Sequence, residues 1–96
     1  MNAKIECNGQ SIQLSGDLVF ASVQQLQTQS KSFKFVEGAA IHIDFTGVTK
    51  VDSAALALCV SLKREFERDN SKIHYDNVPT AMLSIAESVG MDQLFS

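Results

Sequence analysis

The chain contains possible nucleophiles, but the spacing of its reactive residues matches no common catalytic pattern. The two cysteines, Cys7 and Cys59, lie far apart and form no Cys-x-x-Cys pair. This spacing indicates neither a zinc site nor a disulfide framework. The chain has two histidines, and it contains no phosphate-binding loop, no Gly-x-Gly-x-x-Gly, no His-Glu-x-x-His and no Gly-x-Ser-x-Gly motif. We therefore expect a protein without enzymatic activity and without a cofactor.

Both histidines belong to a short internal repeat. The segment Ile41–Asp44 (Ile-His-Ile-Asp) recurs as Ile73–Asp76 (Ile-His-Tyr-Asp), at a separation of about one strand–helix–strand unit. If the two strands are parallel neighbours, His42 and His74 face the same way, and the two aspartates end adjacent strands. One interpretation is a metal site or a pH switch. We favour the other, two solvated histidines on an open sheet face, because no third ligand is evident.

The most informative segment is Phe45–Leu58, in which Asp52-Ser53 stands where a long helix is expected to begin. Either side chain can cap the free N–H groups of the first turn, and that turn carries the positive end of the helix dipole. One interpretation gives Ser53 only a capping role, worth roughly 1 kcal/mol. The other makes Ser53 a contact residue or a phosphorylation site, because the same N–H groups favour a phosphate. The residues alone favour the capping role.

This long helix has an unusual outer surface. Ala57 and Val60 point away from the side that should meet a sheet, Ala54 and Leu56 lie on the flanks, and no charged residue appears before Lys63. A solvated helix is expected to carry charges there. An apolar patch of small side chains instead predicts a docking surface for a partner protein. The alternative is that neighbouring helices of the same chain cover the patch.

Four strands and three helices are expected to position these residues. The alternating Ile5, Cys7, Ile12 and Leu14 flank Asn8-Gly9 and predict a hairpin of strands over 3–8 and 10–15, with Ser15-Gly16-Asp17 breaking the second strand. The other predicted elements are a helix over 19–30, a loop over 31–38, a strand over 39–45, a turn over 46–52, a helix over 53–69, a strand over 72–76, a helix over 80–89 that begins after Pro79 and stops at Gly90, and an apolar segment over 91–95 that tucks onto the core.

The order β-β-α-β-α-β-α predicts a single α/β domain over residues 1–96. A hairpin followed by two strand–helix–strand crossovers gives a four-stranded mixed sheet, and right-handed crossovers place the three helices largely on one face. The other face is then open to water, which accounts for the alternation of apolar and polar residues in the strands.

Composition excludes several classes of protein. The chain is 45% hydrophobic and 20% charged, which excludes a disordered segment. Its net charge of −3 is unlike the basic surface of a nucleic-acid-binding protein. The longest apolar run, residues 54–60, is far shorter than the roughly 20 residues of a membrane-spanning helix, and residues 1–10 lack the apolar stretch of a signal peptide. We expect a cytoplasmic protein that binds no nucleic acid and inserts no segment into a membrane.

The segment 52–58, Asp-Ser-Ala-Ala-Leu-Ala-Leu, follows a strand and a turn and resembles the signature of STAS domains, which include bacterial anti-sigma-factor antagonists. The element order is similar over nearly the whole chain. The short length and the tail 82–95 are most similar to the cytoplasmic STAS subunit of phospholipid ABC transporters. This resemblance implies an accessory subunit that binds and regulates the transporter ATPase, lies at the inner membrane through that ATPase and its permease, and supports outer-membrane lipid asymmetry.

By this resemblance, Ser53 takes the position of the functional Ser or Thr of the family. The expected partner-binding residues are Asp52, Ser53, Ala54, Ala57, Val60 and Thr80. The alternative function is an anti-sigma-factor antagonist that binds a kinase-type anti-sigma factor until Ser53 is phosphorylated. Many STAS domains carry Gly one or two residues after the Ser or Thr, where this chain has Ala54-Ala55; the added methyl groups disfavour the kinase more than the ATPase. Direct binding of a lipid or nucleotide ranks last, since the domain is small and lacks a glycine-rich phosphate loop.

Overall fold

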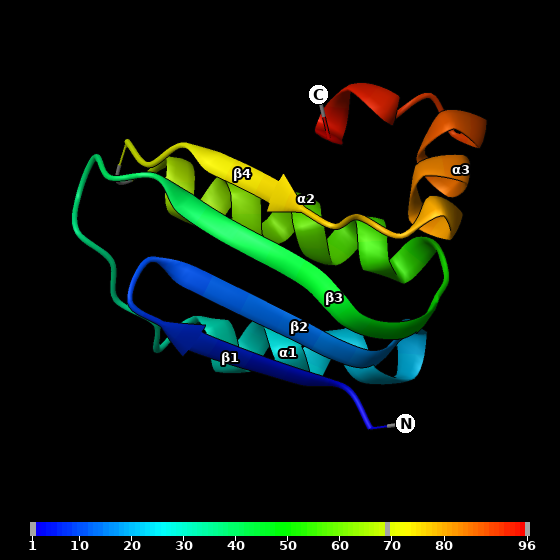
Figure 1. The fold of residues 1–96 in the computed structure, drawn as a ribbon, viewed down its shortest axis with the longest axis horizontal. Helices are drawn as coiled ribbons and strands as arrows, with labels where there is room; N and C mark the ends of the chain where they lie inside the picture. Colours follow the sequence, from blue (N-terminus) through cyan, green and yellow to red (C-terminus); the bar gives the residue numbers. More distant parts are fainter. Residues whose placement is uncertain (1, 69, 96) are drawn as a thin grey trace.

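A computed structural model describes residues 2–68 and 70–95 and shows one twisted sheet with helices packed on it (Figure 1). The elements are β1 (Lys4–Asn8), β2 (Ser11–Leu18), α1 (Phe20–Ser30), β3 (Ile41–Val51), α2 (Ser53–Glu67), β4 (Ile73–Asp76), α3 (Thr80–Ser88) and a 3-10 turn, η1 (Asp92–Phe95). The predicted order β-β-α-β-α-β-α and the predicted four-stranded mixed sheet are confirmed.

The strands lie in the order β1-β2-β3-β4. β1 is antiparallel to β2, whereas β2–β3 and β3–β4 are parallel pairs. Helices α1 and α2 are the two crossovers, and both lie on the same face of the sheet in Figure 1. The internal repeat falls in register, with His42 opposite His74 and Asp44 opposite Asp76. The two repeated strands are therefore parallel neighbours, as the repeat predicted.

β2 and β3 are longer than predicted, and the predicted break and turn are wrong. β2 continues through Ser15-Gly16-Asp17 to Leu18, and β3 continues through residues 46–51. The two segments pair with each other, so each satisfies the backbone groups of the other. The register shifts between Gln13 and Ser15 and again between Gly16 and Asp17, a bulge in which Gly16 adopts a φ of 78°.

The remaining element ends differ from the predictions by one or two residues. Val19 is the N-cap of α1 rather than its first residue. Helix α2 ends at Glu67, with Arg68 as its C-cap, and the predicted end at residue 69 lies outside the described residues. α2 is the longest helix, with 15 residues. Within the described ranges, no helix combines the length and the apolar character that crossing a membrane requires.

The core fills the space between the sheet and the helices. Ile41, Ile43 and Phe45 of β3 are buried there, while the alternate residue His42 is exposed on the other face. The ring of Phe95 in η1 lies 6.4 Å from that of Phe45, centroid to centroid, in an edge-on arrangement. The apolar segment at the end of the chain therefore tucks onto the core, as predicted.

Candidate partner-binding site

Asp52 joins the beginnings of two helices. It is the N-cap of α2, and its Oδ1 accepts a hydrogen bond from the Ala54 N–H at 2.8 Å. Its Oδ2 accepts from the Phe20 N–H, the first amide of α1, at 3.1 Å. Its own N–H donates to the carbonyl of Leu18 at the end of β2. One carboxylate thus satisfies free amides at two helix starts, and it fixes the position of Ser53.

Ser53 is free of the capping role that the sequence favoured. It is the first residue of α2, and the cap is Asp52, so that interpretation is wrong. The Ser53 side chain is exposed, and its hydroxyl has no hydrogen-bond partner among the described residues. The hydroxyl therefore stands at the helix N-terminus, available to a molecule from outside.

A groove runs from Ser53 along α2, between that helix and the segment that follows α3. We call it the α2 groove; it has a volume of about 520 Å³ and is lined by Ser53, Leu56, Ala57, Val60, Ser61, Arg64, Val89 and Met91. Ala57 is exposed, Val60 is half-buried, and Val89 is 56% exposed. Arg64, at the far end, is the one charged residue in this lining. The groove is thus an apolar, neutral surface over most of its length.

The predicted site residues do not all meet in this groove. Ser53, Ala57 and Val60 line it, whereas Asp52, Ala54 and Thr80 are absent from the lining. Thr80 is exposed at the first position of α3, at the end of the molecule where α2 also begins (Figure 1). Asp52 and Ala54 are the chain neighbours of Ser53, and none of the three residues forms a wall of the groove.

The second wall of the α2 groove was not predicted from the sequence. Val89 and Met91 flank Gly90, whose φ of 74° ends α3 and turns the chain. The Met91 N–H donates to the carbonyl of Ala86 at 2.7 Å, which holds this turn in place. An apolar residue on each side of a helix-ending glycine was the available signal. Phe20, also missed, is 84% exposed at the start of α1 and is tied through its N–H to Asp52.

The two histidines of the repeat stack on each other. The rings of His42 and His74 are 5.0 Å apart and nearly parallel, and His42 Nδ1 lies 3.2 Å from Asp76 Oδ2. Asp44 instead accepts from the Thr46 hydroxyl and from Asn77, and these bonds lower the pKa of its carboxyl. Within residues 2–68 and 70–95, no group of three or more His, Cys, Asp or Glu side chains is placed to hold a metal ion.

The buried nucleophiles lie in the core. Desolvation raises the pKa of the Cys59 thiol to about 12, and it also raises the pKa of the Tyr75 hydroxyl. Both groups are therefore neutral at physiological pH, and a thiol of this kind is chemically inert.

The family model described as "Mlab, STAS domain" matches residues 1–96. No curated protein sequence matches the chain. Among solved structures, an anti-sigma-factor antagonist (STAS) domain protein from Planctomyces limnophilus is 15% identical, with a TM-score of 0.74 over 99% of this chain and 87% of that one. The anti-sigma factor antagonist SpoIIAA in its unphosphorylated form is 18% identical, with a TM-score of 0.60 over 88% of this chain and 81% of that one. At these identities the two structures show a shared fold.

Proposed function

The chain belongs to the STAS domain family, whose members are generally non-enzymatic regulators or binding domains, and we propose that it is an MlaB-like accessory subunit of a phospholipid ABC transporter. In this function it binds the ATPase subunit on the cytoplasmic side of the inner membrane, which it reaches through the ATPase and the permease. It thereby supports lipid asymmetry of the outer membrane. The family model described as Mlab, matched over the whole chain, supports the choice of partner.

The observation that carries this proposal is the α2 groove. The exposed Ala57 and the half-buried Val60 present small apolar side chains in the first half of α2, where a solvated helix is expected to carry charge. Small side chains let the backbone of a partner approach closely, and Val89 provides an apolar second wall. A helix of the ATPase with apolar residues on one face is the kind of element that such a groove accommodates.

Binding through the groove regulates the ATPase without any chemical step. A bound subunit shifts a conformational equilibrium only by the difference between its affinities for the two states. We therefore expect the groove to fit one arrangement of the ATPase better than the other. The exposed Ser53 hydroxyl, which has no partner among the described residues, is positioned to supply a polar contact at the edge of the apolar interface.

The test is the affinity for the ATPase. Ala57→Glu places a charge inside the groove, and Ser53→Lys places a long cation at its mouth; each should abolish capture of the ATPase. Ala40→Glu is the matched control, because Ala40 is exposed and lies outside the groove lining. Circular dichroism should show all three variants folded. A complex that survives both groove substitutions would refute this interface.

A second function is favoured by one observation. The Ser53 hydroxyl is exposed, so a kinase can reach it, and the first amides of α2 beside it would favour a phosphate. SpoIIAA, which shares the fold, is an anti-sigma factor antagonist. Phosphorylation would add about −1.5 to −2 charges next to the Asp52 carboxylate and the apolar groove, and so would release an anti-sigma factor kinase. Intact-mass analysis of the protein from its native host decides: a stoichiometric phosphate on Ser53 favours this function over the first.

A further inference from the structure

β1 is an edge strand whose outer side has no neighbouring strand among the described residues. Such an edge presents a row of unpaired backbone N–H and C=O groups. The register identifies these groups. The Gln10 carbonyl accepts from His42 of β3, so the backbone groups of the next residue, Ser11, face β1. Ser11 pairs with Asn8, and Glu6 and Lys4 follow at alternate positions along β1. The N–H and C=O groups of Ile5 and Cys7 therefore face outward.

The charges on β1 select one way of pairing this edge with a copy of itself. Lys4 and Glu6 are exposed and lie on the same face of the strand, on either side of Ile5. In an antiparallel two-fold pair centred on Ile5, each Lys4 lies directly opposite the Glu6 of the second copy. Moving the centre to Lys4 places lysine opposite lysine, and moving it to Glu6 places glutamate opposite glutamate. Pairs of opposite charge stabilise a sheet, and pairs of like charge destabilise it.

The backbone is compatible with the same arrangement. With the centre on Ile5, the outward N–H and C=O groups of the two Ile5 residues meet each other, and those of Cys7 meet Ala3 of the second copy. These are the hydrogen-bonded positions of an antiparallel ladder, whereas Lys4 and Glu6 occupy the positions between them, where side chains approach most closely. The hydrogen-bonding pattern therefore permits this register, and the charges select it over the registers centred on Lys4 or Glu6.

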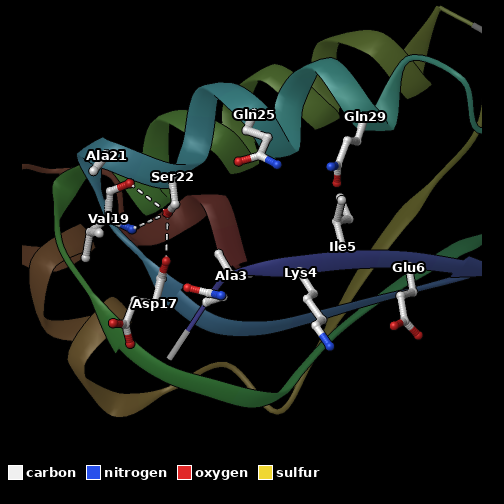
Figure 2. Close-up of a pocket in the computed structure, with 11 residues that line it drawn as sticks. Ala3, Lys4, Ile5, Glu6, Asp17, Val19, Ala21, Ser22, Gln25 and Gln29 are labelled. Atoms are coloured by element: carbon white, nitrogen blue, oxygen red, sulfur yellow. Dashed lines mark hydrogen bonds between the residues drawn. The ribbon is translucent and has the colours of Figure 1, made fainter.

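The space beside this edge is also unfilled on the helix side. A hollow of about 700 Å³ lies between β1 and α1. Gln25 and Gln29 extend from α1 into it, above Ile5, while Lys4 and Glu6 point to the opposite face of β1 (Figure 2). A two-fold axis at Ile5 brings the Gln25 and Gln29 side chains of the two copies toward each other on the helix side of the joined sheet. Amide side chains both donate and accept hydrogen bonds, so they can pair across such an axis.

From these observations we propose that the chain forms a two-fold homodimer through β1, in which two sheets join into one with Ile5 opposite Ile5 and Lys4 opposite Glu6. The α2 groove is lined by none of these residues, so each copy keeps its groove, and the dimer stands or falls independently of the proposed function.

Charge reversal tests the dimer and its register together. Sedimentation velocity of the purified protein over a concentration series should show a monomer–dimer equilibrium that weakens with salt. Lys4→Glu and Glu6→Lys should each raise the dissociation constant about tenfold or more, because each variant creates two like-charge pairs. Mixing the two variants restores opposite charges at both positions, and the mixture should dimerise as the wild type does. Lys72→Glu, at an exposed lysine before β4, is the matched control and should change nothing.

Three results would overturn the proposal. They are a wild-type chain that stays monomeric at every concentration, a dimer that both reversals leave intact, and a mixture of the two variants that remains monomeric. A dimer insensitive to these charges would place the contact elsewhere on the chain. Capture of the ATPase by Lys4→Glu should equal that of the wild type, and loss of capture in Ala57→Glu should leave the dimer unchanged, so the two proposals fail separately.

Discussion

Replacing Asp52 tests whether one carboxylate holds the starts of two helices. Asp52→Ala removes the acceptor of the Ala54 N–H, which is partly buried, and the acceptor of the Phe20 N–H, which is exposed. Loss of an N-cap typically costs about 1 kcal/mol, and the exposed bond belongs at the lower end of that range. We therefore expect the free energy of unfolding to fall by about 1.5–2 kcal/mol, which corresponds to a melting temperature lower by roughly 6–16 °C for a domain of this size.

A graded series separates the two bonds. Asp52→Asn keeps one side-chain oxygen as an acceptor, so it can cap one helix, and it should lose about half as much stability as Asp52→Ala. Urea unfolding monitored by circular dichroism measures both, and the midpoint should move while the slope stays constant. Glu37→Ala, in the exposed loop before β3, should change stability by less than about 0.5 kcal/mol. If Asp52→Ala is as stable as this control, or if Asp52→Asn loses as much as Asp52→Ala, the shared-cap account is wrong.

Three further predictions concern the bulge, the open face and the core. Gly16 has a φ of 78°, and a Cβ atom there would lie against the Asn2 backbone carbonyl. Gly16→Ala should therefore destabilise the fold by about 1–3 kcal/mol. An unchanged urea midpoint would contradict the bulge. The hydrogen bond from Thr46 is the largest cause of the lowered Asp44 pKa, so Thr46→Val should raise that pKa in an NMR titration. The pKa of Asp44 is lower in the folded state than its ordinary value of 3.8, so the stabilisation from Asp44 is present above pH 3.8 and is lost as the pH falls through the folded-state pKa. If the Asp44 pKa stays low in Thr46→Val, the hydrogen bond from Thr46 is not its main cause. Cys59 is fully buried, and burial raises its pKa to about 12, so a thiol reagent should modify the partly exposed Cys7 first and Cys59 only on unfolding. Equal rates for both thiols would show that the core is open.

The element order and the sheet topology could be predicted because local signals agree with tertiary structure. The Asn8-Gly9 pair predicted the hairpin between β1 and β2, and Gly9, with a φ of 63°, is the first residue of its two-residue turn, a position that favours glycine. The repeat of Ile-His-x-Asp marked two strands that are in fact in register. Alternation in β3 correctly separated Ile41, Ile43 and Phe45, which are buried, from the exposed face.

The lengths of β2 and β3 could not be predicted from local signals. Gly16 and Gly47 both suggest breaks, but each occurs where another segment approaches closely. A Cβ at Gly16 would lie against the Asn2 backbone, and a Cβ at Gly47 would lie 2.8 Å from the Ser15 Cβ in β2. Glycine here permits pairing instead of ending it. Only the tertiary contact between segments about 30 residues apart distinguishes these two roles.

The candidate site could be predicted only in part, because some of its features depend on tertiary contacts. The wheel of α2 identified Ala57 as an outward-facing apolar residue, and it is exposed. Asp52 rather than Ser53 caps α2, and Asp52 is also held by the N–H of Phe20, which belongs to another helix. The second wall, Val89 and Met91, depends on how α3 packs against α2. Neither contact leaves a periodic trace in the sequence.

The most direct test of the proposed function is hydroxyl-radical footprinting of the chain alone and in complex with the ATPase. If the ATPase occupies the α2 groove, Val89 and Met91 become protected in the complex, whereas Val36, which is 68% exposed in the loop before β3, reacts at the same rate in both samples. A stable complex in which Val89 and Met91 react as fast as in the free chain would contradict the account.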